Sequence, residues 1–158
     1  MAEIVLLEPD TILADLYIKA FVHQGHSVRR SVSAQNAVFL VDEKLPDVVI
    51  VELQLVAHSG IEFLYELRSY SEWQEIPVLI HSCIPPTEFT NSVKLLRDKL
   101  GVQKYLYKPQ TSLQTLLRSI TEVVSPDEVL HRTAEIDMDD DSPRHPIPMS
   151  VVTFNQSI

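Results

Sequence analysis

Five ionisable or hydrogen-bonding side chains follow apolar runs of this sequence and could together form a charged site. Glu8 and Asp10 follow the first run, Glu52 follows a run of valine and isoleucine, and Ser82 and Lys108 follow two later runs. Three carboxylates, one hydroxyl and one ammonium group can bind ions and share hydrogen bonds if the fold brings them together. Whether these five side chains form one site therefore depends on the strands and helices that connect them.

The apolar runs and the stripes between them predict alternating strands and helices. Buried-strand patterns cover residues 3–8, 26–31, 47–53, 76–81 and 104–107, and a stripe of helical period follows each. Five strands alternating with five helices over residues 1–124 predict an α/β fold in which helices cover both faces of a parallel sheet. The working site of such a sheet lies beyond the carboxyl ends of its strands, so the five side chains are expected to converge there.

The pattern over residues 3–124 resembles the receiver domain of response regulators in two-component signalling. The residues that carry the resemblance are 4–8, 46–52 with Gly60 eight positions later, 76–78 before Ser82, and 104–109. The resemblance implies a flavodoxin-like, doubly wound (βα)5 fold with a five-stranded sheet of order 2-1-3-4-5. It also implies that Lys108 contacts an acyl phosphate, that Ser82 and Tyr105 are the switch residues, and that the peptide bond after Lys108 is cis.

Two positions depart from the family pattern. The family phosphorylates an aspartate at the position of Glu52, and glutamate is longer by one methylene, about 1.5 Å. The family holds Mg²⁺ with two adjacent acids, which align here with Glu8 and Pro9, and Asp10 is placed to cap a helix. Because a displacement of ~1 Å can slow a reaction by about a hundredfold, we expect no conventional phosphorylation. Mg²⁺ binding is expected to be weak or absent, with no other cofactor.

These departures predict a degenerate pseudo-receiver, a stand-alone signalling protein that is not an enzyme and acts through protein–protein interaction. Glu52 could reach Ser82 and Lys108 and hold an activated-like arrangement, or it could form a plain ion pair with Lys108. Two other hypotheses stay open: a phosphorelay response regulator whose acceptor is Glu52 or Asp10, and a structural adaptor subunit with the receiver fold. The resemblance implies a partner, or a second copy of the chain, on the face of the fourth helix, fifth strand and fifth helix.

Composition limits the partners further. The chain has 158 residues, with 13 Lys and Arg against 22 Asp and Glu and a net charge of −9. This balance argues against nucleic acid, because phosphate binding relies on clustered basic residues. No apolar run approaches the ~18 residues of a membrane span, and the N-terminus lacks a signal-peptide pattern. We therefore expect a cytoplasmic protein without membrane contact.

Residues 125–158 differ in composition from the preceding receiver-like domain, residues 1–124. This stretch contains four prolines and an excess of acidic residues, and it has no sustained helical or strand period. We predict a largely disordered acidic tail. Its apolar patch at residues 149–154 could alternatively dock onto another surface.

Cysteine and histidine give weaker signals. Cys83, the single cysteine, excludes an internal disulfide and is predicted as a buried thiol rather than a nucleophile. His58 and His81 could join Glu8 and Glu52 in a transition-metal site, but their spacing matches no common ligand pair, so no bound metal is expected.

Overall fold

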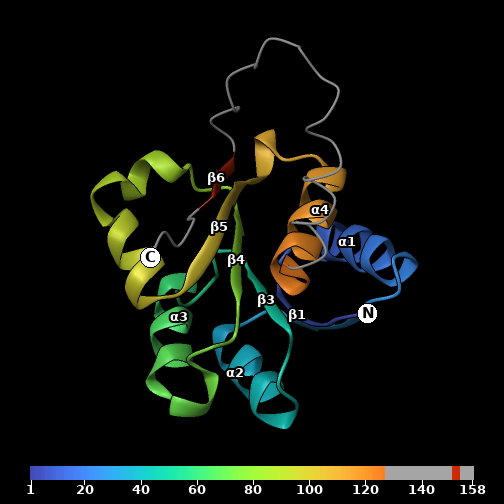
Figure 1. Ribbon diagram of the computed structural model, residues 1–158, viewed down its shortest axis with the longest axis horizontal. Helices are drawn as coiled ribbons and strands as arrows, with labels where there is room; N and C mark the ends of the chain where they lie inside the picture. The colour runs from blue at the N-terminus through green and yellow to red at the C-terminus, as the bar shows by residue number, and fades with distance from the viewer. Residues whose placement is uncertain (127–150, 154–158) are drawn as a thin grey trace.

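The computed structural model describes residues 1–126 and 151–153, which form a sheet with helices on both faces (Figure 1). The sheet has the order β2-β1-β3-β4-β5-β6. Its first five strands are parallel, which confirms the predicted order 2-1-3-4-5. The strands are β1 (Glu3–Leu7), β2 (Ser27–Ser31), β3 (Val48–Val51), β4 (Val78–Ser82), β5 (Val102–Tyr107) and β6 (Val151–Thr153). The helices are α1 (Thr11–His23), α2 (Ala34–Glu43), α3 (Gly60–Ser69) and α4 (Leu113–Val124).

Two hydrophobic clusters, one on each face, hold the sheet between its helices. Side chains of a strand alternate between faces, so Val49 and Val51 of β3 point to one cluster and Ile50 to the other. The first cluster is completed by α2 and α3, and the second by α1 and α4. Strands buried on both faces must be apolar along their whole length, which is why residues 48–51 are all valine or isoleucine.

Side-chain caps fix where the helices begin. Asp10 accepts a hydrogen bond from the Leu13 backbone N–H at 2.9 Å, which confirms its predicted role as the cap of α1. Ser33 and Ser112 cap α2 and α4 in the same way. Ser59 forms a capping box with Glu62 at the start of α3. The caps of α1 and α3 set the course of the chain just after β1 and β3.

The segment between β4 and β5 differs from the predicted fourth helix. It consists of a 3-10 segment, η2 (Pro86–Ser92), and a π segment, η3 (Leu95–Lys99), and Phe89 has non-helical backbone angles. Threonine, asparagine, serine and valine dominate residues 87–93, and these residues are weaker helix formers than alanine or leucine. The apolar spacing there predicted a regular helix wrongly. The predicted fifth helix is α4.

The sixth strand, β6, lies inside the stretch predicted as a disordered tail. It pairs antiparallel with β5 and extends the predicted five-stranded sheet by one strand (Figure 1). The rest of that prediction concerns residues 127–150 and 154–158, which lie outside the described residues. Two further 3-10 segments are η1 (Ser71–Trp73) and η4 (Lys108–Gln110). Within the described residues, no helix has the length and apolar character needed to cross a membrane.

Candidate functional site

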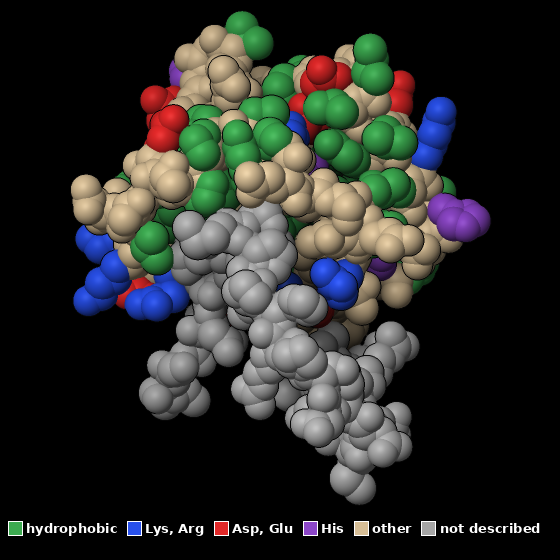
Figure 2. Space-filling model, turned by 90° about the horizontal axis from the view of Figure 1, so that it is seen from above, with side chains coloured by type: hydrophobic (Ala, Val, Ile, Leu, Met, Phe, Trp, Pro, Cys, Tyr) green, Lys and Arg blue, Asp and Glu red, His purple; other side chains and the backbone are tan. Residues whose placement is uncertain are grey.

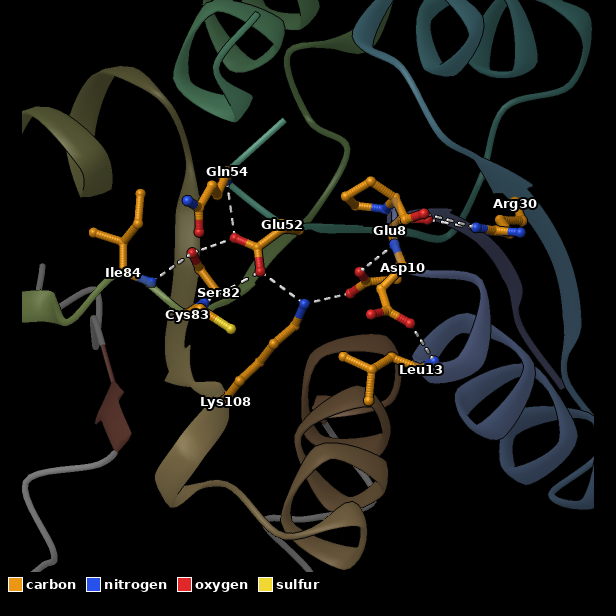
Figure 3. A network of polar contacts seen from close by, with 11 residues as sticks. Glu8, Asp10, Leu13, Arg30, Glu52, Gln54, Ser82, Cys83, Ile84 and Lys108 are labelled. Carbon is orange, nitrogen blue, oxygen red and sulfur yellow. Dashed lines mark hydrogen bonds and ion pairs between the residues drawn. The ribbon is translucent and has the colours of Figure 1, made fainter. Parts of the chain in front are cut away.

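Four of the five predicted site residues meet at the carboxyl ends of β1, β3, β4 and β5 (Figure 3). Glu8, Glu52 and Ser82 are buried, and the Lys108 side chain is only 7% exposed. Parallel neighbours bring these strand ends to one edge of the sheet, as the sequence predicted. The result is a pocket of two carboxylates, one hydroxyl and one ammonium group.

Donors surround the Glu52 carboxylate. Its Oε1 accepts hydrogen bonds from the Ser82 hydroxyl and, at 2.9 Å, from the Gln54 backbone N–H. Its Oε2 accepts from Lys108 Nζ at 2.7 Å and from the Cys83 backbone N–H at 3.2 Å. Burial by itself raises the pKa of Glu52, but the bonds from Lys108, Ser82 and Gln54 outweigh it and lower this pKa below the usual value. Glu52 is therefore ionised and held in one position.

Lys108 joins the two buried carboxylates. Its ammonium group donates to Glu8 Oε2 as well as to Glu52. Burial lowers the pKa of Lys108, but the bonds to Glu52 and Glu8 raise it more, so the side chain stays charged. Glu8 Oε1 accepts from the Asp10 backbone N–H at 3.0 Å. Two carboxylates thus share a single buried cation.

Asp10 contributes its backbone to this network, whereas its carboxylate caps α1 (Figure 3). Arg30 of β2 holds the same turn, because it donates to the carbonyls of Glu8 at 3.1 Å and Pro9 at 3.2 Å. Of the predicted acidic pair, only Glu8 has its carboxylate in the buried network.

The residues present do not fit a Mg²⁺ ion. Pro9 has no carboxylate, Asp10 is committed to the helix, and the carboxylates of Glu8 and Glu52 are paired with Lys108. Mg²⁺ needs octahedral oxygen ligands, including carboxylates that are free to bind it. Among the described residues, no group of three His, Cys, Asp or Glu side chains could hold a metal.

The histidines weighed as metal ligands have other partners. His58 contacts Glu62 at 3.2 Å on the exposed start of α3. His81 is buried and packs edge-on against Tyr17, with ring centroids 5.1 Å apart. Burial, and next the charge of Lys108, lower the pKa of His81 to about 3, so its ring is neutral.

A chain of hydrogen bonds links the pocket to Tyr105. The Ser82 hydroxyl, which donates to Glu52, accepts from the Ile84 backbone N–H at 3.1 Å. The Tyr105 hydroxyl donates to the Ile84 carbonyl at 2.6 Å, and its side chain is 1% exposed. Burial raises the pKa of Tyr105, so the hydroxyl keeps its proton and donates. The Tyr105 side chain therefore points inward and is not exposed on the surface of this structure.

Two expectations about this region are wrong. The Cys83 side chain is exposed, because it lies just beyond the last residue of β4, and its backbone N–H donates to Glu52. The peptide bond between Lys108 and Pro109 is trans, and Pro109 lies in the first turn of η4, where a proline with no N–H is tolerated.

Gly60 lets the chain pass close to β3. A Cβ atom at this position would lie 2.7 Å from the Glu52 carbonyl oxygen and 2.7 Å from Leu53 Cα. The Gly60 N–H donates to the Leu53 carbonyl at 2.8 Å, which holds the loop that presents the Gln54 N–H. The backbone donors of Gln54 and Cys83 could not be found from the sequence, because every residue except proline has a backbone N–H.

The rim near the pocket exposes apolar side chains. Ile12, just after β1, is 81% exposed, and Val56, in the loop after β3, is 95% exposed. Figure 2, which looks down on the end toward which β5 runs in Figure 1, shows hydrophobic side chains gathered over much of the described surface. A polar pocket thus lies beneath a partly apolar surface.

Sequence comparisons find similar curated proteins, although no family model matches the chain. It is 25% identical over 136 residues to the KDP operon transcriptional regulatory protein KdpE of Escherichia coli, an alignment that covers 82% of this chain and 57% of KdpE. It is 28% identical over 101 residues to protein PilH of Pseudomonas aeruginosa, covering 64% of this chain and 79% of PilH. The chain thus spans little more than half the length of KdpE.

Solved structures agree in fold. Chemotaxis protein CheY4 of Vibrio cholerae matches with a TM-score of 0.67 and 20% identity, over 78% of this chain and 98% of the other. The receiver domain of the Francisella response regulator 1452 matches with a TM-score of 0.68 and 24% identity, over 80% and 98% of the two chains. These likenesses show that the chain has the fold of a CheY-like receiver domain.

Proposed function

We propose that this chain is a receiver-type signalling protein that binds partner proteins and works without phosphorylation of an aspartate. The observation that carries the proposal is the Glu52 carboxylate, which accepts bonds from Ser82, Lys108 and two backbone N–H groups. The resemblance to receivers assigns the contacts with Ser82 and Lys108 to an acyl phosphate. In this chain a fixed carboxylate occupies the place of that modification.

The charge balance of the pocket opposes phosphoryl transfer. Glu8 and Glu52 share Lys108 as their buried cation, so an incoming phosphoryl donor would meet excess negative charge. Phosphoryl transfer depends on metal ions and cations that neutralise charge in the transition state. The replacement of an acid by Pro9 removes one ligand for such a metal. The carboxylate that would attack is, in addition, fully engaged with donors.

The hydrogen-bond chain supports a signalling role rather than an isolated ion pair. Glu52 orients the Ser82 hydroxyl, Ser82 binds the Ile84 N–H, and Tyr105 binds the Ile84 carbonyl. The charge of Glu52 therefore influences the position of the Tyr105 side chain through this chain of hydrogen bonds. Ser82 therefore stays bound to Glu52, and Tyr105 to the Ile84 carbonyl, without phosphorylation of the chain.

The labelling experiment separates this proposal from the phosphorelay hypothesis. The full chain is incubated with a small phosphodonor and Mg²⁺, and its intact mass is measured. We expect no mass increase, whereas a gain of about 80 Da would indicate phosphorylation. Location of that mass on Glu52 or Asp10 by fragmentation would support the phosphorelay hypothesis and overturn ours.

The Glu52→Gln variant separates a signalling device from a structural adaptor. Glutamine keeps the shape of the side chain but removes its charge and adds a donor that opposes the backbone N–H groups. We expect the amide NMR signals of Ile84 and Tyr105 to shift, with Glu66→Gln at an exposed position of α3 as the matched control. Unchanged Ile84 and Tyr105 signals would favour the adaptor.

A further inference from the structure

The outermost strand beside β5 comes from far along the chain. In β6, Val151, Val152 and Thr153 pair antiparallel with Leu106, Tyr105 and Lys104 of β5 (Figure 1). Residues 125–150 separate this strand from α4 along the sequence. The receiver fold is complete at α4, so β6 is an addition to one edge of a finished sheet.

The two edges of the five parallel strands are protected in different ways. The β2 edge carries two charged residues within the strand, Arg29 and Arg30, and charged residues in an edge strand are a common defence against unwanted pairing. Both are half-buried and donate to backbone carbonyls. The β5 strand has one charged residue, Lys104, which is buried and bound to Glu122 of α4. Without β6, the β5 edge would offer an unguarded row of backbone donors and acceptors.

The cover that β6 provides is partial. β5 has six residues, and the three-residue β6 pairs only with Lys104, Tyr105 and Leu106. The acceptor strand is itself firmly held, because β4 pairs along its other side and the Tyr105 hydroxyl binds the Ile84 carbonyl. Because the β5 edge is already ordered, β5 loses little conformational entropy when a segment binds to it. A strand longer than β6 could also form more backbone pairs with β5.

From this arrangement we propose that the β5 edge accepts an extended segment of a partner protein by antiparallel strand addition, and that β6 occludes this edge within the same chain. The partner segment is expected to be longer than three residues and uncharged where it faces Tyr105 and Leu106. Strand addition to an exposed edge is a common mode of peptide recognition, in which backbone bonds supply affinity. The inference does not depend on the chemistry at Glu52.

The occlusion has a quantitative consequence. Because β6 is tethered to the same chain, its effective concentration at the β5 edge is on the order of 1 mM, and any free segment must compete with it for that edge. If β6 is paired most of the time, the same segment as a free peptide must bind the vacant edge with a Kd of roughly 1 mM or tighter. A free peptide of residues 149–156 is therefore a usable probe of the edge.

The test vacates the edge in the full chain with Val152→Pro, because proline removes a backbone donor and disfavours strand pairing. Thr153→Pro is a second such variant, and Val152→Thr, which keeps a β-branched residue, is the matched control. Amide hydrogen exchange should speed up only at those β5 residues whose N–H groups face β6. Amides that face β4 should keep their protection, which shows that the domain stays folded.

Binding of the 149–156 peptide is then followed by NMR at millimolar concentration, with the Val152→Pro form of the peptide as a blank. We expect the Val152→Pro chain to bind the peptide at β5 and the wild-type chain to bind it severalfold more weakly. Equal binding by both chains, or none by a chain whose edge is vacated, would overturn the proposal. Concentration-dependent dimerisation of the Val152→Pro chain would also overturn it, because the edge would then pair with a second copy.

Discussion

Glu8 and Glu52 end neighbouring strands and share Lys108, but their surroundings differ. Around Glu52, the hydroxyl of Ser82 and two backbone N–H groups complete a shell of donors. Around Glu8, the next residue is a proline and the next acid, Asp10, caps α1. Under the proposed function, the residues that would contact a phosphoryl group are present and already hydrogen-bonded, whereas one of the two acids that would bind a metal is replaced by Pro9. The predictions below test this contrast.

Loss of Lys108 should have the largest effect, because both regions depend on it. Lys108→Met would leave two buried carboxylates without their shared cation. Breaking a buried ion pair by removing one partner costs about 3–5 kcal/mol, so we expect a loss of this size in the free energy of unfolding at neutral pH. Urea denaturation measures it.

A surface ion pair provides the control for Lys108→Met. Lys44 binds Glu3 at 2.9 Å with its side chain 60% exposed, and Lys44→Met should change stability far less. The loss of unfolding free energy in Lys108→Met, relative to the wild type, should also be smaller at acidic pH, because Glu8 and Glu52 can then take up protons. Equal effects of the two substitutions would show that the buried pair is no more important than a surface contact.

An intermediate effect is expected from His81, which lies beside Ser82 on β4. The pKa of His81 is about 3 in the folded protein, whereas a free histidine side chain has a pKa of 6.5. Below pH 6.5 the unfolded chain binds a proton that the folded chain does not, so stability falls as the pH falls, by up to about 1.4 kcal/mol per pH unit. The lowered pKa of Glu52 acts in the same direction at lower pH.

Denaturation of the wild type and of His81→Phe between pH 7 and pH 5 measures the His81 contribution, because burial also lowers the pKa of His26 and that dependence stays in both chains. His81→Phe, which keeps an aromatic ring beside Tyr17, should flatten the pH dependence over this interval. His58→Ala changes an exposed histidine and should leave the dependence as it is. An unchanged slope in His81→Phe would mean that other groups cause the acid sensitivity.

The smallest effect concerns the metal region. Millimolar Mg²⁺ should leave both the melting temperature and the fluorescence of Trp73 unchanged, because a ligand that binds only the folded state must raise its stability. We expect no Mg²⁺ binding because Pro9 has no carboxylate and the carboxylate of Asp10 caps α1. A reproducible rise in melting temperature, absent with the same ionic strength of NaCl, would show that Glu8 and Glu52 still form a metal site.

The sequence predicted the alternating strands and the meeting of Glu8, Glu52, Ser82 and Lys108, because apolar runs and strand-end polar residues are local patterns. The sheet order came from the family resemblance. The sequence did not predict the irregular backbone of η2, where weak helix formers override the apolar spacing. It did not predict the π segment η3 either, and the leucine, arginine and lysine residues there are good helix formers that give no reason for it. For residues 151–153 the sequence favoured disorder, with docking of the 149–154 patch only as the alternative, and the pairing of β6 with β5 agrees with that alternative. Three residues without a long pattern become a strand only when an edge is available. The backbone donors to Glu52 carry no signal of their own in the sequence.

The central claim is that Glu52 and Pro9 together remove phosphorylation from a pocket that is otherwise intact. The double variant Glu52→Asp with Pro9→Asp restores the shorter acceptor and the second carboxylate. After incubation with a small phosphodonor and Mg²⁺, its intact mass should rise by about 80 Da, while each single variant gains much less because acceptor and metal act together. A folded double variant that stays unlabelled, or a wild-type chain that is labelled, would contradict the claim.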